Sequence, residues 1–288
     1  MKQANLEAER RDGLRRHFSF DWQEVAKHSP DYLEYVEAER QRLGEDHPIF
    51  RTQYRLLTVS GGGRLFTHAQ LAQLQGSHPR LLRPIPGETY VAGIDLAGQA
   101  EAASSSALRQ DSTVVTIARI RASASDFSPS ASTNHLEVIQ HYRWTGVPHA
   151  DLYPQLHDLL RNVWQCRRVV VDATGVGEGV ASFLERSLGG VVVTRFKFTD
   201  QSKSRLGFEL LSAVNSGRLK VYAPDGSEEF RESRRQMELA RTAYRANQTI
   251  DFSVDPSAGH DDFLMSLALV VSASDYAPRV ARGRAREV

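Results

Sequence analysis

The sequence predicts an α/β domain in which a mixed β-sheet carries helices on both faces. Two observations predict this fold. Between residues 85 and 198, three strand-like segments joined by polar connections come first, and two pairs of a helix and a strand follow. Strands joined by such connections pair antiparallel, whereas a helical crossover brings the next strand back parallel. The expected sheet is therefore an antiparallel meander that continues as parallel strands.

Each element is identified by the spacing of its apolar residues. Alternating or continuous β-branched runs indicate strands, and apolar residues three and four positions apart indicate helices. Strands are expected at residues 90–97, 113–121, 136–144, 169–172, 191–198, 219–222 and 250–254. Helices are expected at residues 149–164, 178–188, 204–215, 228–244 and 262–272.

The chain of 288 residues divides into three regions. Residues 1–85 begin as a charged, helix-prone segment and continue with short apolar pieces that a run of glycines at 61–63 interrupts. Prolines then punctuate the chain, so a boundary is expected near residue 85. Residues 86–275 form the α/β domain. The arginine-rich tail at 276–288 is expected to be disordered and could hold DNA weakly.

Composition excludes several classes of protein. Hydrophobic residues make up 41% and charged residues 25% of the chain, which is typical of a soluble globular protein. The net charge of +1 gives no global basic field that would indicate nucleic acid. The single cysteine, Cys166, excludes a disulfide framework and a cysteine-based zinc site. No apolar run approaches the roughly 18–20 residues that span a bilayer, and the charged start lacks a signal core, so a cytoplasmic location is expected.

Acidic residues stand at the ends of three apolar elements. Asp95 lies in an apolar strand, and Asp172 lies where a strand meets a glycine-bearing loop. Asp261 and Asp262 stand just ahead of an apolar helix. A buried carboxylate is costly unless it is paired or binds a metal, and ligands bind at the carboxyl ends of strands in open α/β sheets. Taken singly, each acid could instead be a strand end, a turn residue or a helix cap.

Taken together, these acids predict a metal site. Three acids at the ends of three elements can converge on one rim of the sheet, where they repel one another unless a cation neutralises them. Oxygen ligands suit Mg²⁺ or Mn²⁺, and two such ions about 3.5–4 Å apart can activate a water and stabilise the leaving oxygen of a phosphodiester. Asp111 is either a further ligand or a turn residue. His260 either orients the attacking water or shuttles its proton, or has no role.

Candidate DNA contacts follow the strand expected at 191–198. Lys197, Lys203 and Arg205 could contact phosphate, and Gln201 and Ser202 could donate hydrogen bonds to it. The alternative for Lys203 is a solvated helix start. A row of arginines in and just after the helix expected at 228–244 could also face DNA, although interleaved glutamates favour a salt-bridged solvent face. The row consists of Arg231, Arg234, Arg235, Arg241 and Arg245.

In order and spacing, several motifs resemble the C-terminal nuclease domain of the large terminase subunit of tailed bacteriophages. They lie at residues 93–97, 111–112, 171–177, 198–204, 215–219 and 259–262. The resemblance covers residues 85–275 and implies a ribonuclease H-like fold and metal-dependent cutting of concatemeric viral DNA during genome packaging. It implies metal-binding acids at Asp95, Asp172 and Asp262, with Asp261 and Asp111 in support.

The chain departs from a complete large terminase at its start. Residues 45–54 resemble the segment that links the packaging ATPase to the nuclease, but no phosphate loop of the Gly-x-x-x-x-Gly-Lys-Ser/Thr type is present. No ATP site is therefore expected. The implied partners are double-stranded DNA, a separate packaging ATPase, the small terminase subunit and the portal. The implied location is the cytoplasm of a bacterial host, with the gene carried by a phage or prophage.

Three other functions remain open from the sequence. A Holliday-junction resolvase or a ribonuclease H uses the same acidic chemistry on the same fold. A catalytically inactive packaging component or prophage remnant would keep the fold without cutting. A sugar-kinase-like ATPase would need paired phosphate-binding glycine loops in two similar domains, and only one such domain is visible.

Overall fold

The computed structural model describes residues 2–15, 18–45, 47, 49–56, 63–97, 112–121, 134–175, 177–245 and 249–275. The chain divides into two compact units, Met1–Ser60 and Gly61–Val288. The boundary expected near residue 85 therefore falls inside the second unit. Asp111 and the arginine-rich tail lie outside the described residues. No helix in the described ranges is long and apolar enough to cross a membrane.

The first unit is helical, as the composition of residues 1–45 predicts. It contains α1 (Lys2–Asp12), α2 (Trp22–Ala26), α3 (Pro30–Leu43) and a wide helical turn (Phe50–Tyr54). The carboxylate of Asp21 accepts hydrogen bonds from two backbone N–H groups at the start of α2, which is the usual role of an N-cap residue. A small apolar core includes Trp22, Val36, Leu43, Phe50 and Tyr54.

Within the described residues of the second unit, six strands form the main sheet in the order β6-β5-β2-β3-β4-β7. Neighbours pair antiparallel from β2 to β4, whereas β5, β6 and β7 each run parallel to a neighbour. The predicted meander with a parallel continuation is therefore confirmed. The strands are β2 (Thr89–Asp95), β3 (Ser112–Arg121), β4 (His135–Thr145), β5 (Arg168–Asp172), β6 (Val193–Phe196) and β7 (Leu219–Val221).

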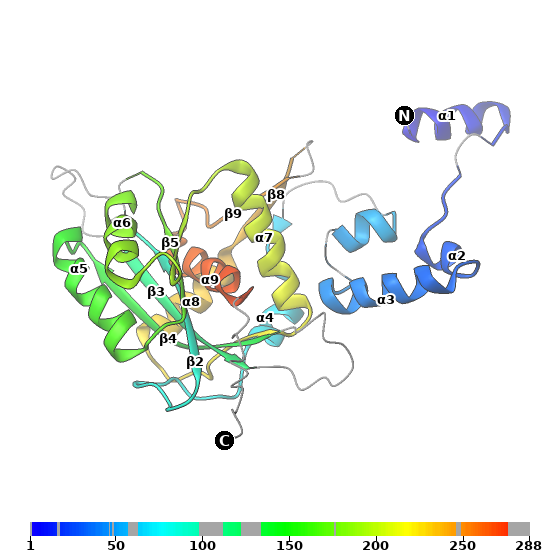
Figure 1. Cartoon of the computed structure of the whole chain (residues 1–288). Helices are drawn as coiled ribbons and strands as arrows, with labels where there is room; N and C mark the ends of the chain where they lie inside the picture. The colour runs from blue at the N-terminus through cyan, green and yellow to red at the C-terminus, as the bar shows by residue number, and fades with distance from the viewer. Residues whose placement is uncertain are drawn as a thin grey trace, which may run out of the picture. The chain divides into compact units, whose positions relative to one another are not determined.

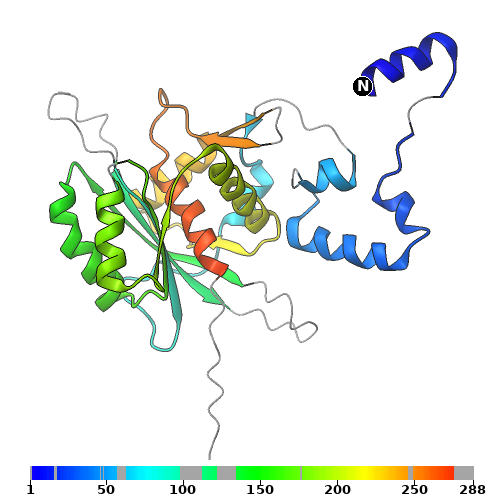
Figure 2. The same cartoon turned by 45° about the horizontal axis from the view of Figure 1, so that its top comes forward.

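Helices cover both faces of this sheet, as predicted (Figures 1 and 2). One face packs against α5 (His149–Asp158), its wide last turn (Leu159–Val163) and α6 (Gly177–Leu188). The other face packs against α9 (Asp262–Ser272), and residues of further helices join the same core. These are α4 (His68–Leu74), α7 (Asp200–Asn215) and α8 (Glu228–Leu239).

A second, small sheet contains residues that were expected to be helical. It joins β1 (Gly63–Arg64), β8 (Arg241–Tyr244) and β9 (Ile250–Ser253) in antiparallel order. The helix expected at residues 228–244 is wrong over its last turns, because the chain becomes extended at Ala240 and continues as β8. The local spacing remains helical there, but pairing with β1 and β9 satisfies the backbone of these residues instead. The strand expected at residues 250–254 is confirmed as β9.

Two further boundaries differ from the expected ones. Helix α7 begins at Asp200 rather than at residue 204, because Thr199 and Ser202 form a reciprocal capping box at its start. Strand β6 begins at Val193 rather than at residue 191, because the residues before it form a turn. The earlier start of α7 places Lys203 within its first turns, and so affects the candidate DNA contacts.

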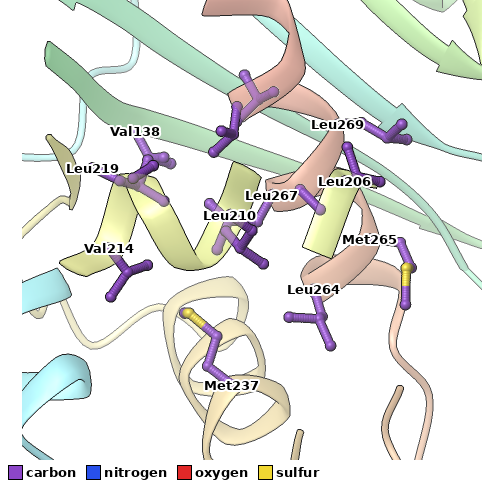
Figure 3. Close-up of a cluster of buried hydrophobic side chains, with 14 of the residues drawn as sticks. Val138, Leu206, Leu210, Val214, Leu219, Met237, Leu264, Met265, Leu267 and Leu269 are labelled. Atoms are coloured by element: carbon purple, nitrogen blue, oxygen red, sulfur yellow. The ribbon is translucent and has the colours of Figure 1, made fainter. Parts of the chain in front are cut away.

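The core between α9 and its neighbouring helices explains why α9 is apolar on all sides. One side of α9 faces the sheet and the other faces α7 and α8, so little of its surface meets water. Figure 3 shows Leu206 and Leu210 of α7 beside Leu264 and Leu267 of α9, with Met237 of α8 in the same cluster. This packing places the first residue of α9, Asp262, on the sheet.

Candidate metal centre

Asp95 and Asp172 end two neighbouring parallel strands. Ile94 of β2 lies opposite Val171 of β5, so the aspartates that follow them occupy the same register. Neighbouring strands lie about 4.8 Å apart, which brings the two backbones together at the carboxyl edge of the sheet. Side chains alternate along a strand, and Val170 packs in the core beneath α9. Both aspartates therefore project to the face that α9 covers.

Helix α9 lies directly on this face because Gly93 leaves room for it. A Cβ atom at Gly93 would stand 2.2 Å from the carbonyl oxygen of Ser266 and 2.3 Å from the backbone nitrogen of Val270. The hydroxyls of Thr116 on β3 and Ser266 on α9 also hydrogen-bond at 2.7 Å. These contacts leave α9 little freedom to slide or rotate on the strands.

Asp262 brings the third carboxylate to the same edge. It is the first residue of α9 and is only 8% exposed. The backbone N–H of Ser112 donates a hydrogen bond to Asp262 Oδ2 at 3.1 Å. Ser112 opens β3, two residues before Val114, which lies opposite Asp95. Asp262 is therefore anchored beside the carboxyl end of β2, where Asp95 lies. The dipole of α9 favours the negative charge of Asp262, because this residue stands at the N-terminus of the helix.

The first turn of α9 is capped by a residue from another helix. Gln236 Oε1 of α8 accepts hydrogen bonds from the backbone N–H groups of Phe263 at 2.8 Å and Leu264 at 3.3 Å. Asp261 occupies the N-cap position, but its side chain makes no capping hydrogen bond. Asp261 is therefore the N-cap residue of α9 by position, without the side-chain bond that a capping aspartate usually makes.

Asp172 sits in a loop that restrains its carboxylate. Its Oδ1 atom accepts a hydrogen bond from the backbone N–H of Thr174 at 2.8 Å. Burial raises the pKa of Asp172 even though hydrogen bonds from Thr174 act in the opposite direction. The hydroxyl of Thr174 accepts a bond from the backbone N–H of Phe198 at 3.0 Å, which ties this loop to the segment after β6. The raised pKa means that the negative charge of Asp172 lacks full compensation, which a nearby cation would supply.

The three acids share an edge without enclosing a metal position. Among the described residues, no group of three or more His, Cys, Asp or Glu side chains is arranged to hold a metal ion. The available donors, the carboxylates of Asp95, Asp172 and Asp262, are all oxygens, the type that Mg²⁺ and Mn²⁺ prefer. Without a cation, mutual repulsion opposes the close approach of such carboxylates. The donor chemistry therefore fits a divalent ion, and binding would require the side chains to close around it.

The structure describes two of the three supporting candidates, which are His260, Asp261 and Asp111. His260 and Asp261 are half-buried in the loop immediately before α9, next to Asp262 in the chain. Asp111, the further candidate ligand, precedes β3 and lies outside the described residues. The structure therefore places two of the three supporting candidates beside one of the principal acids.

Two of the candidate DNA contacts are exposed cations with weak ion pairs. Lys197 is 67% exposed, and its Nζ atom lies 3.2 Å from Glu178 Oε2. Arg205 is 72% exposed, and its Nε atom lies 3.7 Å from Glu209 Oε1. Exposed pairs of this kind contribute about 0–1 kcal/mol, so both cations could exchange their partners for phosphate at small cost.

Lys203 is engaged within the fold. It lies in the first turns of α7, where its Nζ atom is 3.0 Å from Asp251 Oδ1 and 5.6 Å from the centre of the Phe252 ring. The hydroxyl of Ser202 donates to the backbone oxygen of Lys197 at 2.7 Å. Lys203 therefore joins α7 to β9, and Ser202 holds the start of α7.

The arginine row does not form one helix face. Because α8 ends at Leu239, Arg241 lies on β8 and Arg245 follows it. Arg234 pairs with Glu238 at 2.7 Å, and Arg235 pairs with Glu232 at 3.2 Å. The salt-bridged interpretation is confirmed for these two arginines.

Sequence reasoning missed two groups that hold Asp262. The backbone N–H of Ser112 and the side chain of Gln236 both lie far from it along the chain. Ser112 belongs to the motif at residues 111–112, but its role as a backbone donor does not depend on the type of residue and so leaves no signal in the sequence. Gln236 lies among charged residues of α8, and only the packing of α8 on α9 reveals its role.

Solved structures with a similar fold are nuclease domains of phage large terminases. The large terminase nuclease from thermophilic phage G20c with bound magnesium aligns with 73% of this chain and 96% of its own, at 21% identity and a TM-score of 0.53. The Thermus phage P74-26 large terminase nuclease domain aligns with 74% of this chain and 97% of its own, at 19% identity and a TM-score of 0.52. The chain therefore has the ribonuclease H-like fold of these domains.

The HK97 bacteriophage large terminase extends the likeness to most of the chain. The alignment covers 95% of this chain and 54% of that protein, at 13% identity and a TM-score of 0.50. This chain thus spans about half the length of that terminase. No family model matches the sequence, and no curated protein matches it.

Proposed function

We propose that this chain is a divalent-metal-dependent endodeoxyribonuclease that cuts concatemeric phage DNA during genome packaging. The observation that supports it is that Asp95 and Asp172 end two neighbouring parallel strands of a ribonuclease H-like sheet, and that Asp262 is hydrogen-bonded to the first residue of the adjoining strand β3. Solved nucleases with this fold include forms with bound magnesium and bound cobalt.

The proposed ligands are Asp95, Asp172 and Asp262, with Asp261 and Asp111 in support, around two Mg²⁺ or Mn²⁺ ions. When bound, such ions supply the Lewis acidity that activates a water and offsets negative charge on the phosphate. The raised pKa of Asp172, which burial causes, fits this role because the cation compensates a charge that the fold leaves costly.

The reaction is hydrolysis of a phosphodiester. The oxygen of a water forms a bond to phosphorus, and the bond from phosphorus to the 3′ oxygen breaks. His260, in the loop before Asp262, accepts the proton of the attacking water on its imidazole. The departing 3′ oxygen takes up a proton from solvent. Lys197 and Arg205 bind backbone phosphates without reading sequence, and Lys203 holds α7 in place beside them.

The proposed partners follow from this function. Double-stranded DNA is the substrate, and a packaging ATPase moves it past the site. The small terminase subunit and the portal are the other expected components. A resolvase or a ribonuclease H would use the same acids, so branched DNA and RNA–DNA hybrids belong in the substrate panel.

Cleavage of supercoiled plasmid tests the proposal. The purified protein is incubated with Mn²⁺, Mg²⁺ or EDTA beside Asp95→Asn and Asp172→Asn. Asp151→Asn is the matched control, because Asp151 is an exposed acid in the first turn of α5, outside the candidate centre. We expect metal-dependent nicking and linearisation by the wild type and the control, and a loss on the order of a thousandfold or more in the two site variants.

Two results would contradict the proposal. Undiminished cutting by Asp95→Asn or Asp172→Asn would show that the acids at the sheet edge are not the centre. A folded wild-type protein that cuts no DNA with any divalent ion, even with a packaging ATPase added, would indicate an inactive packaging component. Preferential cutting of branched DNA would indicate a resolvase instead of a terminase nuclease, and preferential cutting of RNA–DNA hybrids would indicate a ribonuclease H.

A further inference from the structure

The first turn of α9, which carries Asp262, is held from outside by a buried side chain of α8. We infer that Gln236 is a positioning residue for the metal-binding carboxylate of Asp262. This inference rests on the proposed function and extends it to a residue that contacts neither metal nor DNA.

The amide of Gln236 is fixed in one orientation. Gln236 is 1% exposed, and its Nε2 group donates to Glu232 Oε1, one turn earlier in α8, at 3.1 Å. The opposite end, Oε1, accepts from the backbone N–H groups of Phe263 and Leu264. Since those groups only donate, the oxygen of the amide must face them and the nitrogen must face the carboxylate. A reversed amide would leave both ends without a suitable partner.

The bonds from Gln236 replace the cap that α9 does not make itself. The first N–H groups of any helix have no partner within the helix, so other groups must satisfy them. Asp261 stands at the N-cap position without supplying a side-chain cap. Gln236 supplies the acceptor instead, and so fixes the first turn of α9 relative to α8.

Asp262 is thereby held between two anchors. The residues immediately after it are bound to α8 through Gln236, and its own carboxylate is bound to the backbone N–H of Ser112 on β3. The ring of Phe263 also packs edge-on against that of His141 on β4, with ring centres 5.5 Å apart. These contacts come from three elements and restrain the direction from which the carboxylate approaches the sheet edge.

Loss of the acceptor should weaken metal binding before it unfolds the chain. The backbone N–H groups of Phe263 and Leu264 are buried, so without Gln236 Oε1 they must shift to find another acceptor or remain unsatisfied. Either result moves the turn that begins with Asp262. Loss of groups that orient metal ligands typically weakens metal binding by roughly 10–100-fold.

Calorimetric titration with Mn²⁺ in the absence of DNA tests this inference on the whole chain. The first variant is Gln236→Met, which keeps the length of the side chain and removes the acceptor. The second is the exchange Glu232→Gln with Gln236→Glu, which keeps the net charge and the acceptor that faces α9, and reverses the donor and acceptor between positions 232 and 236. Met237→Ala is the matched control, because it opens a cavity in the same helix without touching these bonds. Thermal unfolding is measured for all four proteins.

We expect Gln236→Met to weaken Mn²⁺ binding by roughly tenfold or more. The exchange variant should bind close to the wild type, and Met237→Ala should lose thermal stability without a change in Mn²⁺ affinity. Wild-type affinity in Gln236→Met would overturn the inference. So would equal weakening in Met237→Ala, because general destabilisation would then explain the loss. If Gln236→Met does not fold, weakened binding by the exchange variant overturns it. Absence of Mn²⁺ binding by the wild type would instead overturn the proposed function itself.

Discussion

The two faces of the main sheet are built from the same strands but bury different chemistry. The face under α5 and α6 is almost wholly apolar, and Ala92, Ile94 and Val171 are typical of it. The face under α9 is apolar too, but it also buries polar groups, several of which have partners from other elements. Among them are Thr116, Gln236, Asp262 and Ser266. Alternation along the strands assigns residues to one face or the other, and the candidate site lies wholly on the second.

The difference shows that the face under α5 and α6 chiefly stabilises the fold, whereas the face under α9 also fixes the position of that helix on the sheet. Apolar contacts are not directional, so α5 and α6 can adjust to small changes in packing. Hydrogen bonds have a narrow range of geometry, so those under α9 specify where the helix begins. Changes in the two faces should therefore differ in their effects on stability, on its pH dependence and on metal binding.

Replacing Gly93 should lower the stability of the fold, whereas replacing Gly179, an exposed glycine of the helix α6 that covers the apolar face, should raise it. The new Cβ of Gly93→Ala would stand 2.2 Å from a backbone oxygen of α9, so the helix must move, at a cost of about 1–3 kcal/mol or more. Gly179→Ala on α6 meets its nearest atom at 3.4 Å, and alanine favours the helix by up to about 1 kcal/mol. Urea unfolding measures both changes, and Mn²⁺ titration should show weaker binding only for Gly93→Ala. A stable Gly93→Ala variant with unchanged Mn²⁺ affinity would break the contrast.

The face under α9 should also carry a pH dependence that the other face lacks. Burial lowers the pKa of His141 to about 3, and the charge of Arg80 acts in the same direction. The unfolded chain takes up a proton on this histidine below about pH 6.5, whereas the folded chain does not. The free energy of unfolding therefore decreases as the pH decreases below about 6.5. The stability that His141 contributes is complete above about pH 6.5 and is lost as the pH falls towards 3.

The measurement is the free energy of unfolding between pH 7 and pH 5 for the wild type and His141→Gln. We expect the wild type to lose up to about 1.4 kcal/mol more per pH unit than the variant. On the opposite face, burial raises the pKa of the Cys166 thiol, so that group stays uncharged in this range. The same pH dependence in both proteins would show that His141 is not the group responsible.

The smallest effect is expected for the stability of the metal-free protein when an acid of the site is neutralised. Because burial raises the folded-state pKa of Asp172, its ionised form is less favourable in the folded chain than in the unfolded one. This penalty is present at neutral pH. It disappears as the pH falls through the pKa of Asp172 in the folded chain towards its pKa in the unfolded chain. Asp172→Asn should therefore raise Tm slightly in EDTA at pH 7 while abolishing cutting. A lower Tm would show that the carboxylate stabilises the fold.

The principal candidate acids could be predicted because each stands at the end of a strongly apolar element. Strand residues before Asp95 and Asp172 are buried in continuous runs, and such runs are recognisable from residue type alone. The direction of the strands follows from the connections between them, so their common edge was also predictable. The roles of these acids stay predictions until the cleavage and binding experiments are done.

The remainder depended on contacts between residues distant in the chain. The expected helix at 228–244 failed because β8 pairs with β1 and β9, and neither partner lies within reach of a local pattern. The ion pair of Lys203 with Asp251 on β9 also joins segments distant in the chain, so no local pattern reveals it. A contact of Lys203 with DNA stays a prediction. In the case of β8, pairing across the fold outweighed a local helical preference.

The sequence by itself determined the succession of the strands of the main sheet and the helices between them, the mixed sheet and the acids at its edge, because periodicity, strand ends and connections are local properties of the chain. Only the tertiary structure decided how the acids are held. Asp262 reaches the edge of the sheet because Gly93 admits the backbone of α9 and Gln236 and Ser112 satisfy polar groups at its start. The physical reason is that a hydrogen bond or a close backbone approach depends on two segments at once, and neither segment alone carries a pattern that reveals the other.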